Sequence, residues 1–361
     1  MAQLNIPLFK EISETPGAPG YENRIREVVL REVSPLADHV SVDNLGNVVA
    51  LKKGTASGTE NRKRVMAAAH MDEIGFIVKH IDSNGFIRFH LLGGFDPKTL
   101  TAQRVIIHGK KDVVGVMGSK PIHVMNEEER KRLPKATDYF IDCGMPREEV
   151  EQFISVGNPI TRDREFIQMG HCVNGKSIDN RVAVFLLIEA LRELKDIPYD
   201  FYAVFTVQEE VGIRGASVAA HTIDPDFGIG IDTTVAYDLP GASDHEMVTS
   251  LGKGAGIKVL DGSVISDSRM VEFMKHVAEK NNIAYQMEVL PAGGTDTAGV
   301  QRMGKRGAIA GAISIPTRHL HQVIEMAHTD DIRAAIDLLK ECLYSMDQYD
   351  WGFPMREGEK E

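Results

Sequence analysis

The chain has 361 residues, 43% of them hydrophobic, so it can bury a sizeable core and form two domains, which excludes a disordered protein. Its formal net charge of −11 argues against a nucleic-acid partner or an anionic membrane surface, since both repel an acidic protein. Three widely spaced cysteines exclude a disulfide framework or a zinc finger, and no segment has the pattern of an export signal or a membrane span. We therefore predict a cytoplasmic protein.

The first 73 residues are predicted to alternate between helices and strands. Apolar residues at helical spacing predict helices over Leu4–Pro16 and Tyr21–Val33, and short strands are expected over Val40–Asp43 and Val48–Lys52. After a polar loop over Thr55–Arg64 comes the apolar run Val65-Met66-Ala67-Ala68-Ala69. It ends in His70-Met71-Asp72-Glu73, so a buried strand with metal-binding residue types at its tip is predicted.

The pattern changes between Ile74 and about Arg164. Short alternating segments such as Phe86-Ile87-Arg88-Phe89 and Arg104-Val105-Ile106-Ile107 are separated by turns that contain glycine, which is typical of a small β-rich module. We predict a domain over residues 74–164 that is inserted into a discontinuous α/β domain of residues 1–73 and 165–361. It has no clustered set of metal-binding residues, so we expect it to serve assembly and substrate access.

The α/β pattern resumes with further core elements that end or begin in polar residues. Asp179 lies near the start of a helix over Val182–Leu194, where it could also act as a helix cap. The buried strand Phe201–Val207 is followed by Glu209 and Glu210, whose side chains should face different neighbours because successive residues leaving a strand alternate. The pattern further predicts the strand Phe227–Asp232, the helix Ser268–Lys280, the loop Pro291–Thr297, the strand Gly307–Ile315 leading to His321, and the helix Thr329–Met346.

Metal-binding residue types thus recur at five places, namely His70, Asp179, Glu209-Glu210, Asp232 and His321. Oxygen and nitrogen donors without thiolates favour zinc, cobalt or manganese. The set is too large for one catalytic zinc. It suits two metals about 3.5–4 Å apart that share one bridging aspartate, which leaves one glutamate as a general base.

The polar residues belong to motifs that follow one another along the chain in this order: His70-Met71-Asp72-Glu73-Ile74-Gly75, Ser177-Ile178-Asp179-Asn180-Arg181, Val207-Gln208-Glu209-Glu210-Val211-Gly212, Asp232 and Ile315-Pro316-Thr317-Arg318-His319-Leu320-His321. This ordered set resembles the di-metal aminopeptidases of the glutamyl aminopeptidase and tetrahedral (TET) aminopeptidase family. The resemblance spans nearly the whole chain. It implies a mixed central sheet flanked by helices, with an inserted PDZ-like β domain. It also implies a homo-oligomer of twelve subunits.

The resemblance also assigns roles to the motif residues. It implies that His70 and Asp232 hold one metal, Glu210 and His321 hold the other, and Asp179 bridges them. Glu209 would then be the catalytic base and Asp72 would orient His70.

Three positions depart from the family pattern. Asn180 follows Asp179 where a second aspartate is common, and His319 and Gln322 replace a common tyrosine and serine. None of the three removes a predicted metal ligand. His319 lies two residues from His321, but the alignment of the motif favours His321 as the ligand.

The resemblance predicts an aminopeptidase that cleaves peptides with a metal-bridging water and Glu209 as general base. One alternative is a related deacylase of N-acyl amino acids, which would keep the metals. Another is a scaffold that forms a shell and has no catalytic activity. A glycosidase would use two carboxylates without metal, and the adjacency of Glu209 and Glu210 and the two histidines speak against it. The preferred N-terminal residue and the native metal stay open.

Overall fold

Four parallel strands form the centre of the larger part of the molecule in the computed structural model, which describes residues 4–56 and 62–353. Antiparallel strands extend the sheet on both sides, in the order β1-β2-β12-β3-β13-β16-β17-β11-β10, with β14 and β15 branching from β16. Within the described ranges the sheet has eleven strands: β1 (His39–Val42), β2 (Val48–Lys52), β3 (Arg64–His70), β10 (Ile167–Met169), β11 (Cys172–Gly175), β12 (Asp200–Thr206), β13 (Phe227–Val235), β14 (Ala255–Leu260), β15 (Tyr285–Val289), β16 (Ile309–Arg318) and β17 (Glu325–His328).

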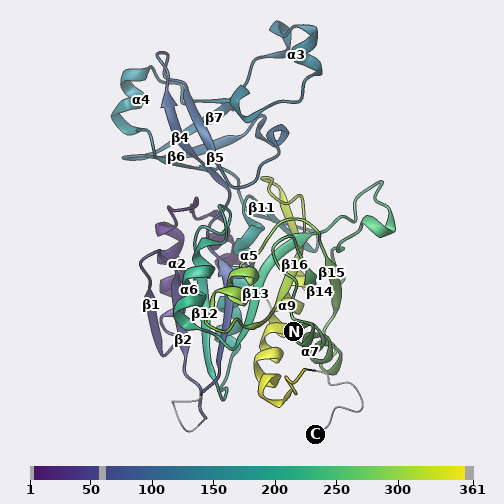
Figure 1. The fold of residues 1–361 in the computed structure, drawn as a ribbon. Helices are drawn as coiled ribbons and strands as arrows, with labels where there is room; N and C mark the ends of the chain where they lie inside the picture. The colour runs from purple at the N-terminus through teal and green to yellow at the C-terminus, as the bar shows by residue number, and fades with distance from the viewer. Residues whose placement is uncertain (1–3, 57–61, 354–361) are drawn as a thin grey trace.

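Helices cover both faces of this sheet (Figure 1). One face packs against α1 (Ile6–Glu14), α2 (Asn23–Val33), α5 (Ile178–Glu193), α7 (Ser268–Lys280) and α9 (Thr329–Ser345), and the other against α6 (Arg214–Ile223) and α8 (Thr297–Met303). The alternation of β3 serves both layers, because Val65 and Ala67 pack into the first core and Met66 and Ala68 into the second. A strand that is buried on both faces has apolar residues at successive positions, which explains the unbroken apolar run in the sequence.

The predicted elements of the α/β part are confirmed, with small shifts at their ends. The largest difference is at α5, which begins at Ile178 rather than Val182, with non-helical backbone at Asp179 and Asn180. The predicted loop Thr55–Arg64 falls partly on residues 57–61, which lie outside the described residues. None of the helices among the described residues is both long and apolar enough to cross a membrane.

The segment between β3 and β10 forms a closed barrel with a core of its own. Its order is β4-β5-β8-β7-β6-β9, and β9 closes it by pairing with both β4 and β6. The bounds are β4 (Gly75–Ile81), β5 (Ile87–Leu92), β6 (Arg104–His108), β7 (Asp112–Gly118), β8 (Phe140–Asp142) and β9 (Pro159–Arg162), with α3 (Glu127–Lys131) and α4 (Arg147–Phe153) between them. The mixed α/β architecture is confirmed, whereas the PDZ-like identity of the barrel stays a prediction.

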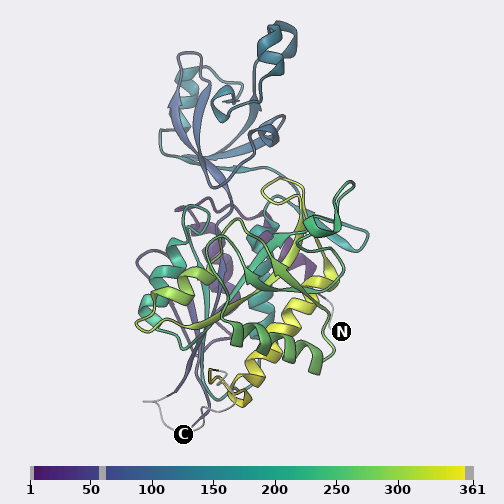
Figure 2. The same cartoon turned by 45° about the vertical axis from the view of Figure 1, so that its right-hand side comes forward.

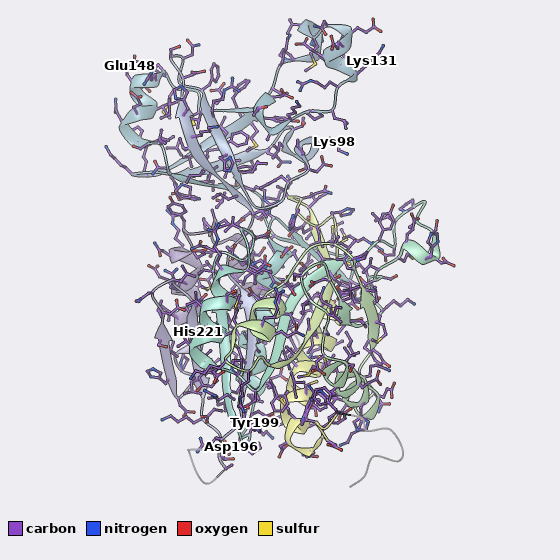
Figure 3. The ribbon with its side chains drawn as sticks, in the orientation of Figure 1. Lys98, Lys131, Glu148, Asp196, Tyr199 and His221 are labelled. Atoms are coloured by element: carbon purple, nitrogen blue, oxygen red, sulfur yellow. The ribbon has the colours of Figure 1, made fainter. Side chains whose placement is uncertain are left out.

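The barrel stands over the carboxyl ends of the parallel strands, and α3 projects from it on an arm (Figures 1 and 2). Lys131 and Glu148 therefore lie at one end of the molecule, and Asp196 and Tyr199 at the other (Figure 3). Short 3₁₀ helices complete the chain: η1 (Pro97–Leu100), η2 (Ile122–Val124), η3 (Ala136–Asp138), η4 (Asp244–Glu246) and η5 (Met346–Gln348). This placement brings loops of the barrel close to the edge of the sheet where the predicted metal-binding residues lie.

Candidate metal centre

The predicted metal-binding side chains converge at the carboxyl edge of the parallel strands, which is where open α/β sheets place their ligand sites. His70 is the last residue of β3, Asp232 lies in β13, and Glu209 and Glu210 follow β12. Asp179 is at the start of α5, and His321 follows β16. All six line one cleft of about 640 Å³.

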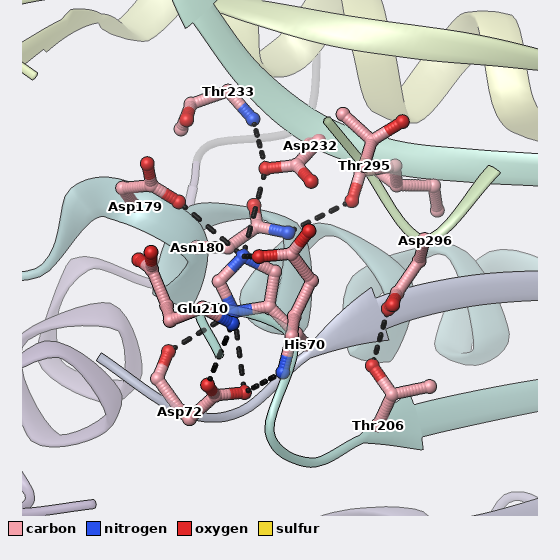
Figure 4. Close-up of polar contacts among 12 residues, drawn as sticks. His70, Asp72, Asp179, Asn180, Thr206, Glu210, Asp232, Thr233, Thr295 and Asp296 are labelled. Atoms are coloured by element: carbon pink, nitrogen blue, oxygen red, sulfur yellow. Dashed lines mark hydrogen bonds and ion pairs between the residues drawn. The ribbon is translucent and has the colours of Figure 1, made fainter. Parts of the chain in front are cut away.

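One group of possible metal ligands consists of His70, Asp179 and Asp232. His70 Nε2 lies 3.4 Å from Asp179 Oδ1 and 3.8 Å from Asp232 Oδ1 (Figure 4). All three residues are buried, and the backbone N–H of Thr233 donates to Asp232 Oδ1 at 2.8 Å. One nitrogen and several carboxylate oxygens at this spacing are a donor set that suits a divalent cation.

A second group consists of Asp179, Glu210 and His321. His321 Nε2 lies 3.4 Å from Asp179 Oδ2 and 3.6 Å from Glu210 Oε2. Asp179 therefore belongs to both groups, with Oδ1 toward His70 and Oδ2 toward His321. A carboxylate in this position can bridge two cations. His319 belongs to neither group within the described part of the chain.

The two histidines are oriented by backbone carbonyls. His70 Nδ1 lies 3.0 Å from the carbonyl oxygen of Asp72, and His321 Nδ1 lies 2.7 Å from the carbonyl oxygen of Gly94 in the loop after β5. A proton on each Nδ1 would donate to the carbonyl and leave Nε2 free for a metal.

The Asp72 carboxylate contacts both His70 and the turn that carries the two glutamates, and its orienting role toward His70 stays a prediction. It is 3.5 Å from His70 Nδ1, and it accepts the backbone N–H groups of Glu209 and Glu210 at 3.0 and 3.1 Å. Asp72 thus contacts His70 through both its main chain and its carboxylate, and the same carboxylate holds the backbone of the two glutamates.

The electrostatics of the cleft favour bound positive charge. Burial raises the pKa of Glu210 to about 7, and it raises the pKa values of Glu209 and Asp232 well above the usual carboxyl range. Burial opposes the charged form of His321, but Asp179 and Glu210 outweigh it and raise the pKa of His321 to about 10. Four carboxylates thus face two imidazoles, and divalent cations would balance their charge.

The buried polar atoms also fit this interpretation. Asp179 Oδ1 and Glu210 Oε1 are buried and have no hydrogen-bond partner among the described residues, although buried oxygens are normally paired. Metal coordination would use both atoms. Burial opposes the charge on Asp179, but the nearby imidazoles of His321 and His70 outweigh it and lower its pKa.

Glu209 belongs to neither group of metal-binding residues. Its Oε2 lies 3.8 Å from His70 Nε2, on the His70 side of the cleft, whereas Glu210 points toward His321. The predicted division of the two glutamates between different neighbours is therefore seen.

Several residues around the site were not predicted from the sequence. Asp296 is buried, accepts a hydrogen bond from the Thr206 hydroxyl, and has a pKa that burial raises to about 6. Glu325 Oε2 accepts the backbone N–H of Asp179 at 3.0 Å. An acidic residue inside an apolar or glycine-rich segment is the one signal that could have indicated them.

The chain is similar to known aminopeptidases over nearly its whole length. The family model of the M42 glutamyl aminopeptidases matches residues 46–338. A lysyl aminopeptidase of Pyrococcus furiosus is 35% identical over 95% of this chain and 98% of its own length. A TET aminopeptidase from a marine-sediment Thaumarchaeota archaeon superposes with a TM-score of 0.90, at 37% identity over 94% of this chain and 95% of that one. A TET1 peptidase of Pyrococcus horikoshii, which can assemble into a tetrahedron or a large octahedral shell, superposes with a TM-score of 0.83, at 32% identity over 94% of this chain and 99% of that one.

Proposed function

The chain belongs to the M42 glutamyl aminopeptidase family, and on this premise we propose that it removes N-terminal residues from peptides with the help of two divalent metal ions. The observation that carries the proposal is the sharing of Asp179 between two groups of metal-binding side chains. His70 and Asp232 would hold one ion and Glu210 and His321 the other. Zinc or cobalt suits these donors best, and manganese is the third candidate.

When bound, the ions would supply Lewis acidity toward a water and toward the scissile carbonyl. The protein side chains then have two tasks. Glu209 takes the proton of the attacking water and returns it to the leaving amine, a role that its raised pKa suits. Asp72 holds the backbone N–H groups of Glu209 and Glu210, so that one carboxylate serves as base and the other as ligand.

The test is a panel of aminoacyl anilides with stripped protein to which zinc, cobalt or manganese is added back. We expect activity only with metal, and none toward N-acetylated substrates. Equal turnover of acetylated substrates would point to the deacylase, and no turnover with any metal would point to the inactive scaffold. The names of the relatives favour neither alternative.

We further propose that residues 74–164 are an inserted domain and that the protein is a homo-oligomer, with twelve subunits as the first expectation. The separate core of the barrel supports the former, and the assembly of the Pyrococcus horikoshii relative supports the latter. Deleting residues 74–164 should leave a folded α/β core whose assemblies contain fewer subunits than those of the full chain. A deletion protein with the same number of subunits per assembly would contradict a role of this segment in assembly. A cytoplasmic location also stays a prediction.

A further inference from the structure

The turn that presents Glu209 and Glu210 is held from outside by side chains. Gln208 has a φ of 55°, in the left-handed region that residues with a β-carbon seldom adopt. Four successive backbone N–H groups in this turn donate to side-chain oxygens, as follows: Val207 to Asn47 Oδ1 at 3.0 Å, Gln208 to Glu22 Oε1 at 3.2 Å, Glu209 to Asp72 Oδ1 at 3.0 Å and Glu210 to Asp72 Oδ2 at 3.1 Å.

Glu22 is the unexpected member of this set. It occupies the N-cap position of α2 but makes no side-chain hydrogen bond to that helix. Instead its Oε1 accepts the N–H of Gly20 at 2.7 Å and that of Gln208, and only 1% of the residue is exposed. A carboxylate buried in this way is costly unless its hydrogen bonds compensate, so its placement needs a reason.

Asn47 fixes the start of the same turn. Its Nδ2 donates to Asp43 Oδ2 at 2.6 Å and to the Gly215 carbonyl at 3.0 Å, so Oδ1 must face the N–H of Val207. Asn47 thus holds the residue before the strained Gln208, Glu22 holds Gln208 itself, and Asp72 holds the two glutamates after it.

We propose that Glu22 is a positioning residue of the reaction, which fixes Gln208 in its left-handed conformation so that Glu209 and Glu210 diverge to opposite sides of the cleft. Glu22 acts through the Gln208 backbone, and the inference rests on the proposed function. Glu22 contacts Gln208 through a single hydrogen bond, which the backbone N–H of Gln208 donates. The position of the acceptor oxygen is therefore expected to matter more than the charge on Glu22. A misplacement of the glutamates by about 1 Å could cost about 10²-fold in rate.

Two conservative variants separate reach from charge. Glu22→Gln keeps an acceptor oxygen at the same distance and loses the charge, whereas Glu22→Asp keeps the charge and is one methylene too short. We expect Glu22→Gln to retain kcat within about threefold, and Glu22→Asp to lose about 10–100-fold in kcat with little change in KM. Glu27→Ala, on the exposed side of α2, is the matched control and should behave as wild type.

Two measurements besides turnover complete the test. Thermal unfolding should show that both variants fold, and metal analysis after graded chelator dialysis should show Glu22→Asp losing a metal earlier, because Glu210 is displaced. Full kcat in Glu22→Asp, or a Glu22→Gln as impaired as Glu22→Asp, would overturn the proposal. An inactive wild type with metal added would instead refute the proposed function, while early metal loss in Glu22→Asp would still support the positioning role.

Discussion

The two histidine ends of the candidate metal centre are built differently. His70 ends a central strand, is 1% exposed, and is oriented by the main chain two residues further on. His321 lies in a loop with a φ of 60°, its side chain is 37% exposed, and it is oriented by Gly94, a residue 227 positions away beside the barrel. The first end is therefore fixed by the core sheet, whereas the second depends on the barrel staying in place over the cleft.

Removing the residue that both ends share should have the largest effect. Asp179→Asn replaces the bridging anion with a neutral amide, so we expect loss of both metals and a fall in kcat/KM of about 10⁴-fold or more. Activity assays and elemental analysis check this. Asp330→Asn, an exposed carboxylate in the first turn of α9, is the control, and a variant with Asp179→Asn that keeps both metals would refute the bridging role.

The adjacent glutamates should separate chemistry from metal binding. Glu209→Gln should keep both metals, since no ligand is lost, and should reduce kcat by about 10²–10⁴-fold. Glu210→Gln should weaken the metal on the His321 side, because an anionic ligand becomes a neutral one. Metal content measured beside turnover distinguishes them, and the reverse pattern would mean that the two roles are exchanged.

The two ends should also differ in how firmly they hold a metal. On dialysis against increasing chelator, we expect the metal at the His321 end, which is more exposed than the His70 end, to leave first. His321→Ala should keep one metal, and His70→Ala should lose the tightly held one. Simultaneous loss of both metals from the wild type would show that burial does not distinguish the ends.

The smallest effect is expected where only the orientation of His321 is disturbed. A β-carbon on Gly94 would lie 3.3 Å from His321 Nδ1, so Gly94→Ala should shift the imidazole by a few tenths of an ångström. We expect metal affinity at that end to fall by up to about tenfold and the other end to be unchanged. Gly144→Ala, where a β-carbon would meet nothing within 4 Å, controls for a glycine replacement elsewhere in the barrel, although its φ of 66° adds local strain.

The sequence predicted the parts of the site that lie at the ends of apolar runs. His70 ends β3, Asp232 lies within β13, and Glu209 and Glu210 follow β12. These strands are buried on both faces, so each appears in the sequence as a local apolar run next to its polar residue. Asp179 and His321 rested on the family resemblance as well. The structure brings all six into one cleft, while their roles stay proposals.

What the sequence did not indicate depends on contacts between distant segments. Glu22 accepts a hydrogen bond from Gln208, which lies 186 positions later in the chain. The contact to His321 is made by the backbone carbonyl of Gly94, and no side chain marks this contact in the sequence. The closure of the barrel was also missed. It requires β9 to pair with β4 and β6, and the local alternation of each strand says nothing about its partners.

The pairing of β3 has a consequence for the order of folding. Both neighbours of β3, β12 and β13, begin more than 130 residues later in the chain, whereas the strands of the barrel are local to residues 75–162. Long loops must close before the central sheet gains its contacts, which slows its formation. We expect the barrel to fold first during refolding. Pulsed hydrogen exchange should then show protected amides in β6 and β7 before those in β3, and the opposite order would contradict this expectation.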